Sequence, residues 1–425
     1  MSALVACAAC ARTFPLTSAV VECPCGGLLE VRQCPAEHGR RLRERFDRRR
    51  VRDATGAGSG VWRFRELLMP GRVAPVTHPE GNTALYRRQA VSRYAGIEDL
   101  CLKHEGENPT GSFKDRGMTV AVTQAVRAGA SAVACASTGN TSASMAAYAA
   151  QAGLPAFVFV PCGKVAAGKL AQALAYGART LLVRGDFDAC LRLVREASQA
   201  LGMTLLNSVN PWRLEGQKTI VLELLQQRGW DPPDWIVVPA GNLGNTSAFG
   251  KALREALDLG LIRRMPRIAS IQAAGAAPFQ RSFRGGFRRR YRVEAETVAT
   301  AIRIGDPASF DRAVRAIRET RGVVAAVSDR EILEAKAVVD AAGIGCEPAS
   351  AASVAGLRQL ARRGIVGRGQ SVVAILTGHL LKDPQTVMDF HLGGGRRANA
   401  PVEIEASVAA VERLLSRARR QGHGP

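Results

Sequence analysis

Hydrophobic and polar residues follow one another along most of this chain in blocks that predict a parallel α/β fold. Three blocks can be read as an apolar strand followed by a polar loop, and two of the loops lead into a helix. The strands are expected at residues 132–136, 156–160, 235–238 and 371–376, and the helices at residues 141–152 and 247–257. Strands that alternate with helices indicate a sheet covered by helices.

The polar loops that follow these strands are expected to line one site. They read "STGNTS", "PAGNLGNT" and "TGH". In open α/β sheets, ligands bind where the carboxyl ends of strands meet the amino ends of helices. At 425 residues, the chain is long enough for two packed domains, and a ligand site between them is a natural expectation.

Lys114 is predicted to point into the protein interior. In "NPTGSFKDRG", turn residues precede Ser112, which we expect to cap a helix whose first turn holds Lys114. The buried face of that helix includes Met118, four positions after Lys114. Burial and the positive end of the helix would lower the pKa of the amine, and a neutral amine is the form that makes a Schiff base. A lysine whose stem packs while its head reaches water is the alternative.

The first thirty-five residues concentrate cysteines in a way that suggests a zinc knuckle. Cys7, Cys10, Cys23 and Cys25 form two close pairs. The second pair is C-x-C, narrower than the C-x-x-C of ordinary zinc ribbons, which would strain tetrahedral ligation. Bound zinc and four free thiols are both open interpretations.

The net charge of +21 makes a nucleic-acid partner worth considering. Arginines are densest at residues 40–50 and 281–292, but neither run accompanies a motif that reads nucleic acid, so we expect solvated arginines and no nucleic-acid partner. The amino terminus lacks the pattern of a signal peptide, and no apolar segment approaches the ~20 residues of a membrane span. We therefore expect a cytoplasmic protein without a membrane partner, whose ten cysteines are thiols or metal ligands.

The segment "NPTGSFKDRG" resembles the cofactor-lysine motif of threonine synthases and related fold-type-II pyridoxal-phosphate enzymes. Seven more segments, in the family's order, resemble threonine synthases across residues 75–390: "CASTGNTSASMAAYAAQAGL", "GKLAQALAYGA", "NSVNPWRLEGQKT", "VPAGNLGNTSA", "TAIRIGDPAS", "GCEPASAAS" and "LTGHLLKDP". The resemblance implies a tryptophan-synthase-β-like α/β fold of two three-layer domains with pyridoxal 5'-phosphate in the cleft between them. It also implies a homodimer.

We expect four regions along the chain. They are a Cys-rich zinc-knuckle-like segment (1–35), a solvated polar helical connector (36–75), a catalytic core (76–395, with a smaller domain at about 120–205) and a linker with a C-terminal helix (396–425). That last helix is expected at about residues 402–418.

The resemblance also implies which residues hold the cofactor. Lys114 would carry it as a Schiff base, Asn140 would bond the ring hydroxyl oxygen, and Thr377 would face the pyridine nitrogen. The glycine-rich turn would cradle the phosphate with Gly241, Asn242, Leu243, Gly244 and Asn245, because such turns aim N–H groups and a helix end at anions.

The resemblance implies that the substrate is O-phospho-L-homoserine, converted with water to L-threonine and phosphate by a carbon–oxygen lyase (EC 4.2.3.1). The resemblance implies that Asn207, Ser208 and Arg213 hold the substrate phosphate, a set of donors suited to a phosphate ester. It places the loop of Ser137, Thr138 and Thr141 near the substrate carboxylate. Helix capping is the alternative role for that loop.

Two departures from the family pattern bear on the substrate. Ala84 replaces a proline in "EGNTALYR", and Leu380 replaces a glycine after "TGH". A related enzyme acting on another phosphorylated amino acid, such as a cysteate synthase, is therefore the closest alternative. A serine or threonine dehydratase and a zinc-knuckle protein that binds RNA through its arginines are more distant ones.

Overall fold

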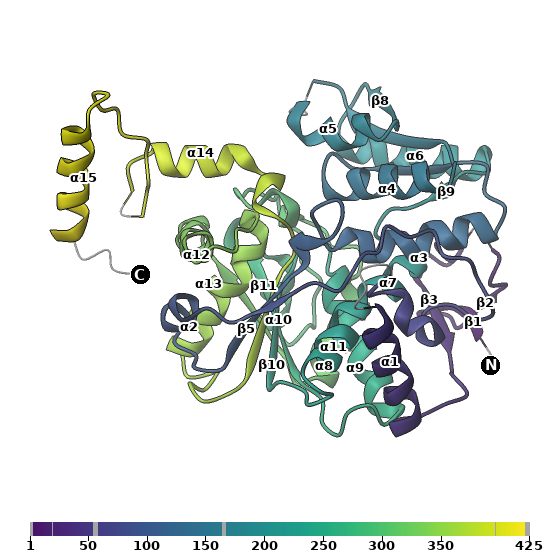
Figure 1. Ribbon diagram of the computed structural model, residues 1–425. Helices are drawn as coiled ribbons and strands as arrows, with labels where there is room; N and C mark the ends of the chain where they lie inside the picture. Colours follow the sequence, from purple (N-terminus) through teal and green to yellow (C-terminus); the bar gives the residue numbers. More distant parts are fainter. Residues whose placement is uncertain (1–2, 19, 54–57, 164–166, 396, 421–425) are drawn as a thin grey trace. The chain divides into compact units, whose positions relative to one another are not determined.

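The computed structural model describes residues 3–18, 20–53, 58–163, 167–395 and 397–420, and within them the strands form three sheets (Figure 1). The six-stranded sheet has the order β12 (Val323–Val327), β11 (Arg267–Ala273), β10 (Trp235–Pro239), β13 (Val372–Leu376), β5 (Leu100–His104), β4 (Leu85–Tyr86). The four-stranded sheet has the order β8 (Arg179–Val183), β7 (Ala156–Pro161), β6 (Val133–Ala136), β9 (Thr204–Leu205). All neighbours pair in parallel except β4 and β5.

Helices cover both larger sheets. The α-helices up to residue 383 are α1 (Gly39–Asp53), α2 (Gln89–Ala95), α3 (Lys114–Arg127), α4 (Asn140–Gln151), α5 (Ala167–Ala175), α6 (Phe187–Ala200), α7 (Pro211–Gln217), α8 (Thr219–Gln227), α9 (Gly244–Asp258), α10 (Pro278–Arg284), α11 (Phe310–Glu319), α12 (Asp329–Ala341) and α13 (Pro348–Arg362). Short 3-10 helices are η1 (Trp62–Leu67), η2 (Glu105–Glu107), η3 (Ala274–Ala276), η4 (Thr300–Ile302) and η5 (Leu380–Lys382).

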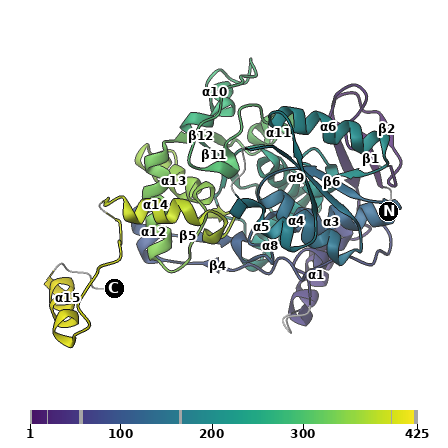
Figure 2. The ribbon, with the colours of Figure 1, turned by 90° about the horizontal axis from the view of Figure 1, so that it is seen from above.

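Alternating residues of the six-stranded sheet supply two separate cores, one on each face. In β10, Ile236 and Val238 pack with α8 and α9, whereas Trp235 and Val237 pack with α12 and α13. The four-stranded sheet is built the same way, because Cys135 of β6 packs with α3 and α4, and Ala134 packs with α6. Both sheets therefore form three layers, which confirms the predicted fold (Figures 1 and 2). We call the six-stranded sheet with its helices the large lobe, and the four-stranded sheet with its helices the small lobe.

The predicted strand–loop–helix units are present with shifted helix starts. The strands β6, β7, β10 and β13 match the predicted ranges to within one residue. Helix α4 begins at Asn140, one residue earlier than expected, and α9 begins at Gly244, three residues earlier. Both shifts bring the helix ends closer to the strands that precede them.

The Cys-rich segment folds as a small antiparallel sheet with the order β2 (Thr13–Phe14), β1 (Ala3–Cys7), β3 (Leu29–Gln33). Figures 1 and 2 show it beside α3 at the edge of the small lobe, where Gln124 of α3 donates a hydrogen bond to the Leu16 carbonyl at 2.5 Å. The connector contains the expected helix, α1. It is not fully solvated, because Leu42 and Phe46 are buried in the core of the large lobe.

A cluster of buried charges lies next to the start of α3. Arg116 forms ion pairs with Glu105 at 2.6 Å and with Glu223 at 2.8 Å. Glu223 also pairs with Lys103 at 2.6 Å and Arg63 at 2.9 Å. All of these side chains are buried, so each carboxylate depends on its cationic neighbours for compensation. The cluster ties α3 to α8 and β5, two residues away from Lys114.

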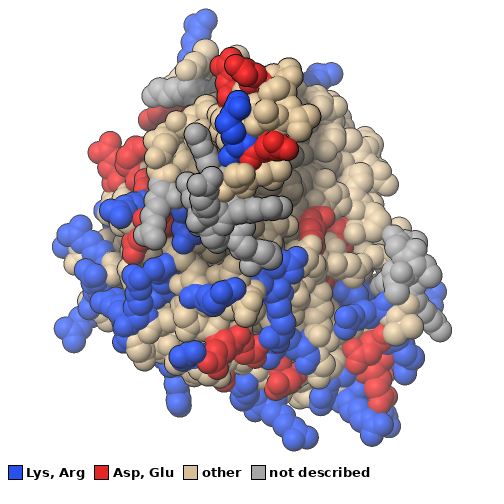
Figure 3. Space-filling model, turned by 60° about the vertical axis from the view of Figure 1, so that its left-hand side comes forward, with Lys and Arg blue, Asp and Glu red and all other residues tan. Residues whose placement is uncertain are grey.

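Part of the basic surface is paired within the protein. In the arginine-rich stretch, Arg290 and Arg292 form ion pairs with Asp306 at 2.5 and 3.0 Å, and Arg281 lies over the ring of Tyr291 at 4.3 Å. On the face shown in Figure 3, Lys and Arg side chains are widespread, with Asp and Glu side chains among them. The stretch at residues 281–292 therefore has a local structural role.

Contacts divide the chain into a compact unit from Met1 to Asp383 and a second unit from Pro384 to Pro425. The second unit contains α14 (Pro384–Leu392) and α15 (Val408–Arg420). Helix α15 begins later than expected, because the Ser407 hydroxyl caps it by accepting a hydrogen bond from the Ala410 N–H at 3.2 Å. None of the helices in the described ranges is long and apolar enough to span a bilayer.

Candidate active site

Lys114 is the first residue of α3 and its side chain is half-buried. Its Nζ lies 4.1 Å from the ring centroid of Phe113. Burial lowers the pKa of Lys114 to about 7, and the positive charge of Arg213 adds to this effect, whereas Glu347 opposes it. The direction of this shift is the one that the sequence predicts for the amine, and the role of Lys114 as the cofactor lysine stays a prediction. Ser112 is a weaker cap than expected, because Phe113 is the capping position and the Ser112 hydroxyl accepts only a 3.4 Å bond from the Lys114 N–H.

The loop before Lys114 is bonded to the end of β13. The Phe113 N–H donates to the Thr377 carbonyl at 3.0 Å, and the His379 N–H donates to the Gly111 carbonyl at 2.9 Å. Gly111 has a φ of +84°, which favours glycine. These bonds place Thr377 beside the start of α3, so two residues predicted for the same site are brought together from opposite ends of the core.

Glu347 connects Asn140 to Thr377. Its carboxyl group accepts a hydrogen bond from Asn140 Nδ2 at 2.9 Å and another from Thr377 Oγ1 at 3.1 Å. The side chain is buried, and this burial raises the pKa of Glu347. Thr377 Oγ1 also lies 3.0 Å from Ser350 Oγ. The sequence analysis missed Glu347, although its position just before Pro348, at the start of α13, marks a helix end near the strand that carries Thr377.

The glycine-rich turn lies between β10 and α9. Gly241 packs so tightly that a Cβ would lie 2.8 Å from the Ile302 Cα, and Leu243 adopts a left-handed conformation with φ +63°. Gly244 and Asn245 start α9, where backbone N–H groups have no partner within the helix. Such a turn offers N–H donors to an anion with no side chain in the way at Gly241. It fits the predicted phosphate cradle.

The side chains of the turn link it to its neighbours. Asn242 Nδ2 donates to Ser208 Oγ at 3.0 Å, and Asn242 Oδ1 accepts from the Ala308 N–H at 2.9 Å. Asn245 Oδ1 accepts from Gln217 Nε2 at 2.7 Å. The structure therefore brings Ser208, one of the predicted substrate residues, into direct contact with the turn.

Arg213 is a buried guanidinium that forms no ion pair within the described ranges. Its Nη1 donates to the Leu206 carbonyl at 3.1 Å, and its Nε has no hydrogen-bond partner. Burial lowers the pKa of Arg213 to about 10. A buried cation without a carboxylate is costly unless an anion joins it, so this side chain fits a site for a phosphate group.

Asn207 follows β9, and its amide pairs in both directions at 3.0 Å with the backbone of Ala136, the last residue of β6. One N–H of that amide remains for a ligand. In the loop before α4, Ser137 Oγ accepts from the Gly139 N–H at 3.3 Å, while Thr138 and Thr141 are half-buried. The alternative role of this loop, capping α4, is limited. The N-cap residue of α4 is Gly139, which has no side chain to accept a hydrogen bond.

Helices α3 and α7 touch through their backbones. A Cβ on Gly216 of α7 would lie 1.7 Å from the Arg116 carbonyl oxygen of α3, and a Cβ on Gly117 would lie 3.0 Å from the Arg213 carbonyl oxygen. Only glycine allows this approach. This contact places the start of α3, which carries Lys114, near the first turn of α7, which carries Arg213.

The two departures from the family pattern have local explanations. The Ala84 N–H donates to Glu107 Oε2 at 2.6 Å, a bond that a proline could not make. The Leu380 side chain lies over Gly345, where a Cβ would be 2.2 Å from Leu380 Cδ2. Lys382 Nζ donates to the Thr110 carbonyl at 3.0 Å and so supports the loop before Lys114. Of the four cysteines in the first segment, Cys7 ends β1, and Cys10, Cys23 and Cys25 lie in the turns beside it.

Comparison with known proteins agrees with this geometry. Residues 76–378, more than half of the chain, match the family described as "Pyridoxal-phosphate dependent enzyme". The threonine synthase of Methanosarcina acetivorans is 50% identical over 357 residues, covering 84% of this chain and 86% of that protein. The threonine synthase of Methanocaldococcus jannaschii is 43% identical over 412 residues, covering 96% of this chain and 98% of that protein.

Among solved structures, threonine synthase from Escherichia coli superposes with a TM-score of 0.67 at 20% identity, covering 97% of this chain and 99% of that one. The processed form of threonine deaminase isoform 2 from Solanum lycopersicum superposes with a TM-score of 0.65 at 18% identity, covering 85% of this chain and 96% of that one. At these identities the likeness concerns the fold, and it is consistent with the two lobes described above.

Proposed function

The chain belongs to the pyridoxal-phosphate-dependent enzyme family and, within it, to the threonine synthases, and from this membership we infer that it converts O-phospho-L-homoserine and water to L-threonine and phosphate. The observation that carries the substrate is the buried guanidinium of Arg213, which forms no ion pair among the described residues and whose positive charge lowers the pKa of the Lys114 amine. This supports a site in which a catalytic amine and an anion-binding group act on the same substrate.

Pyridoxal phosphate, when bound, supplies an aldehyde that joins amino groups covalently and a ring that accepts electrons from Cα. The side chains that would hold it are Lys114 for the aldehyde, Asn140 for the ring hydroxyl oxygen and Thr377 for the pyridine nitrogen. The turn from Gly241 to Asn245 would hold its phosphate through backbone N–H groups.

Lys114 is the residue we assign to proton transfer. With cofactor and substrate bound, the free amine of Lys114 would remove the proton from Cα, and a pKa of about 7 would leave a useful fraction of it neutral at neutral pH. The overall reaction also removes a proton from Cβ, releases phosphate from Cγ, returns a proton to Cγ, adds water at Cβ and returns a proton to Cα. Lys114 is the base that we assign to the Cβ proton as well.

Arg213, Ser208 and Asn207 would bind the substrate phosphate. Charge builds on the phosphate as its bond to Cγ breaks, and a fixed guanidinium stabilises that charge without reorganising. Ser137, Thr138 and Thr141 would face the substrate carboxylate at the start of α4. Glu347 would orient Asn140 and Thr377, because it accepts a hydrogen bond from each of them.

The assay that tests the function measures threonine and phosphate release from O-phospho-L-homoserine, with phosphoserine plus sulfite as the parallel substrate pair. Production of threonine and phosphate supports the proposal. Cysteate formed from phosphoserine and sulfite, with no threonine from phosphohomoserine, would indicate a cysteate synthase. Ammonia released from serine or threonine alone would indicate a dehydratase.

We further propose that the chain forms a homodimer and works in the cytoplasm. A hollow of about 570 Å³ lies along β12, the edge strand of the six-stranded sheet, with Phe283, Leu360 and Ile365 in its lining. Edge strands expose unpaired backbone groups that another chain can cover. Light scattering of the purified protein tests the proposed dimer, and a monomer mass at micromolar concentration would contradict it.

The cysteines support the proposed cytoplasmic location. All ten are free thiols, which suits a reducing compartment.

The regions expected along the chain also stand as a proposal. The small sheet, the connector with α1 and the two lobes follow one another in the expected order. The compact unit ends at Asp383, whereas we proposed residue 395 for the end of the core. Limited proteolysis with mass mapping of the fragments would locate the boundary.

A further inference from the structure

Four thiols gather in the small antiparallel sheet at the amino terminus. Cys7 ends β1, Cys10 follows it in a turn, and Cys23 and Cys25 lie in the turn before β3. Their four Sγ atoms all lie within 4.8 Å of one another. Individual separations are 3.5 Å for Cys7 and Cys25, 3.6 Å for Cys10 and Cys23, and 3.4 Å for Cys10 and Cys25.

These separations suit a metal ion and not disulfides. A disulfide needs two sulfur atoms at about 2.05 Å. Four sulfur atoms placed tetrahedrally at about 2.3 Å from one Zn²⁺ lie about 3.8 Å apart, which is close to the arrangement found. A tetrahedral set of four sulfur ligands is typical of zinc or iron–sulfur proteins. We propose that Cys7, Cys10, Cys23 and Cys25 bind one structural Zn²⁺ ion.

The backbone around Cys7 supports a thiolate. The N–H groups of Ala9 and Cys10 donate to Cys7 Sγ at 3.3 and 3.5 Å. The turn closes because the Ala11 N–H donates to the Cys7 carbonyl at 3.2 Å, with Ala11 in a left-handed conformation at φ +59°. A negatively charged sulfur is stabilised by such donors, and zinc binds the thiolate form.

Two glycines explain how the short C-x-C spacing is accommodated. Gly26 has a φ of +81°, and its N–H donates to the Cys23 carbonyl at 2.8 Å. A Cβ on Gly27 would lie 2.5 Å from Cys7 Sγ and 3.2 Å from Cys25 Sγ. The chain therefore reverses direction directly after Cys25, and Gly27 packs against the Sγ atoms of Cys7 and Cys25. The narrow spacing that counted against zinc in the sequence is compatible with the fold.

The site has a structural role and not a catalytic one. Protein ligands fill all four positions, and no ligand position remains for a substrate or water. The sheet it would hold is small, since β1 and β3 have five residues each and β2 has two. Such a sheet is marginal without additional cross-links.

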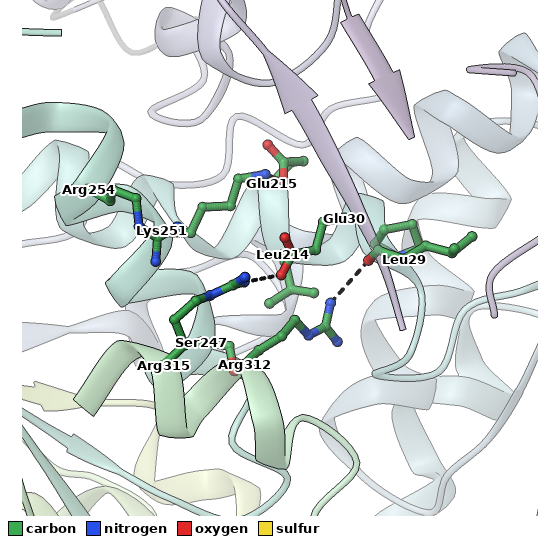
Figure 4. A pocket seen from close by; sticks show the side chains of 10 residues that line it. Leu29, Glu30, Leu214, Glu215, Ser247, Lys251, Arg254, Arg312 and Arg315 are labelled. Atoms are coloured by element: carbon green, nitrogen blue, oxygen red, sulfur yellow. Dashed lines mark hydrogen bonds and ion pairs between the residues drawn. The ribbon is translucent and has the colours of Figure 1, made fainter. Parts of the chain in front are cut away.

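Strand β3 joins the metal site to the large lobe. The Leu29 carbonyl accepts a hydrogen bond from Arg312 of α11 at 3.2 Å, and Glu30 forms an ion pair with Arg315 of the same helix (Figure 4). The Val31 carbonyl accepts from Lys251 of α9 at 2.5 Å. Lys251 is the eighth residue of α9, so β3 holds this helix well beyond the glycine-rich turn at its start. We therefore expect zinc loss to destabilise the protein before it affects cofactor binding.

The test measures metal and cofactor in the same purified holoenzyme. Elemental analysis of protein made in zinc-supplemented medium should give about one zinc per chain. Blocking the thiols with a mercurial should release that zinc to a chromogenic chelator, while the absorption band of the cofactor persists. Lack of zinc in stoichiometric amount, with four reactive thiols in its place, would overturn the proposal, and so would bound iron in place of zinc.

Two exposed ligands allow a variant test with a matched control. Cys10→Ser and Cys25→Ser should each lose most of the zinc and lower the thermal midpoint, with the cofactor band retained in the folded fraction. Cys34→Ser, which alters an exposed cysteine outside the cluster, should keep both zinc and midpoint. Zinc retained in full by both ligand variants would show that these thiols do not bind it.

Discussion

Asn140 donates a 2.9 Å hydrogen bond to Glu347, and this bond joins the first residue of α4 in the small lobe to the residue that precedes α13 in the large lobe. The same carboxyl group accepts a bond from Thr377. Two proposed contacts of the cofactor ring therefore share one buried support. The lobes are held together at the place where the reaction would occur.

Lys114→Ala is expected to abolish covalent cofactor binding. The family's lysine-bound cofactor absorbs at about 410–420 nm, and this band should be missing from the variant. In the wild-type protein, borohydride reduction followed by peptide mass mapping should locate the cofactor on Lys114. A band that borohydride still bleaches in the variant would contradict the assignment.

The lowered pKa of Lys114 predicts how cofactor uptake depends on pH. Only the neutral amine attacks an aldehyde, and its pKa of about 7 lies far below the usual value for lysine. The rate at which cofactor-free protein takes up pyridoxal phosphate should rise through pH 7 and level off above about pH 8. Stopped-flow absorbance measures this rate. A rate that still climbs about tenfold per pH unit at pH 9 would indicate an ordinary lysine.

Arg213→Ala is expected to raise KM for O-phospho-L-homoserine by about 10- to 100-fold, the loss expected for a charged hydrogen bond. The cofactor band should remain. Because Arg213 lowers the pKa of Lys114, the pH midpoint of cofactor uptake should also move upward in this variant. Arg213→Lys serves as the control, because lysine keeps the positive charge but lacks the two parallel N–H donors of the guanidinium. An unchanged KM in Arg213→Ala would place the phosphate elsewhere.

Glu347→Leu and Glu347→Gln should differ. Leucine leaves the Asn140 amide without its acceptor, at about 1–3 kcal/mol, and leaves the Thr377 hydroxyl with Ser350 alone, so cofactor affinity should fall at least about tenfold. Glutamine can accept a hydrogen bond from Asn140, and it can accept one from the Thr377 hydroxyl or donate one to it. Cofactor affinity should therefore stay within about threefold of the wild-type value. Titration of cofactor-free protein measures both values. Equal losses in the two variants would show that a full carboxylate is needed.

Glu223→Gln tests the buried ion cluster. Burial opposes ionisation here, but Arg116, Lys103 and Arg63 outweigh it and hold the pKa of Glu223 well below its usual value. Its contribution is therefore present above the unfolded pKa of about 4.5 and is lost as the pH falls below it. At pH 7 the variant should be about 3–5 kcal/mol less stable to urea, because cations are left uncompensated. Glu334→Gln, in an exposed pair with Arg330, should cost under about 1 kcal/mol.

Local patterns in the sequence predicted much of the fold. The strands β6, β10 and β13, and the inward direction of Lys114, followed from runs of apolar residues and from the four-residue step to Met118. Glu347 was missed because its partner Asn140 lies 207 positions away in the sequence, and no local pattern reports such a bond. The start of α15 was misplaced because the cap at Ser407 outweighed the apolar spacing that precedes it.

The backbone contact between α3 and α7 has a consequence for the length of the substrate. With glycines at positions 117 and 216, the two helices meet without side chains between them and can shift only as one rigid body. The backbones that carry Lys114 and Arg213 then keep a constant separation. If a substrate bridges the Lys114 amine and the Arg213 guanidinium, as we propose, then phosphohomoserine and phosphoserine, which differ by one methylene group, should be told apart by length.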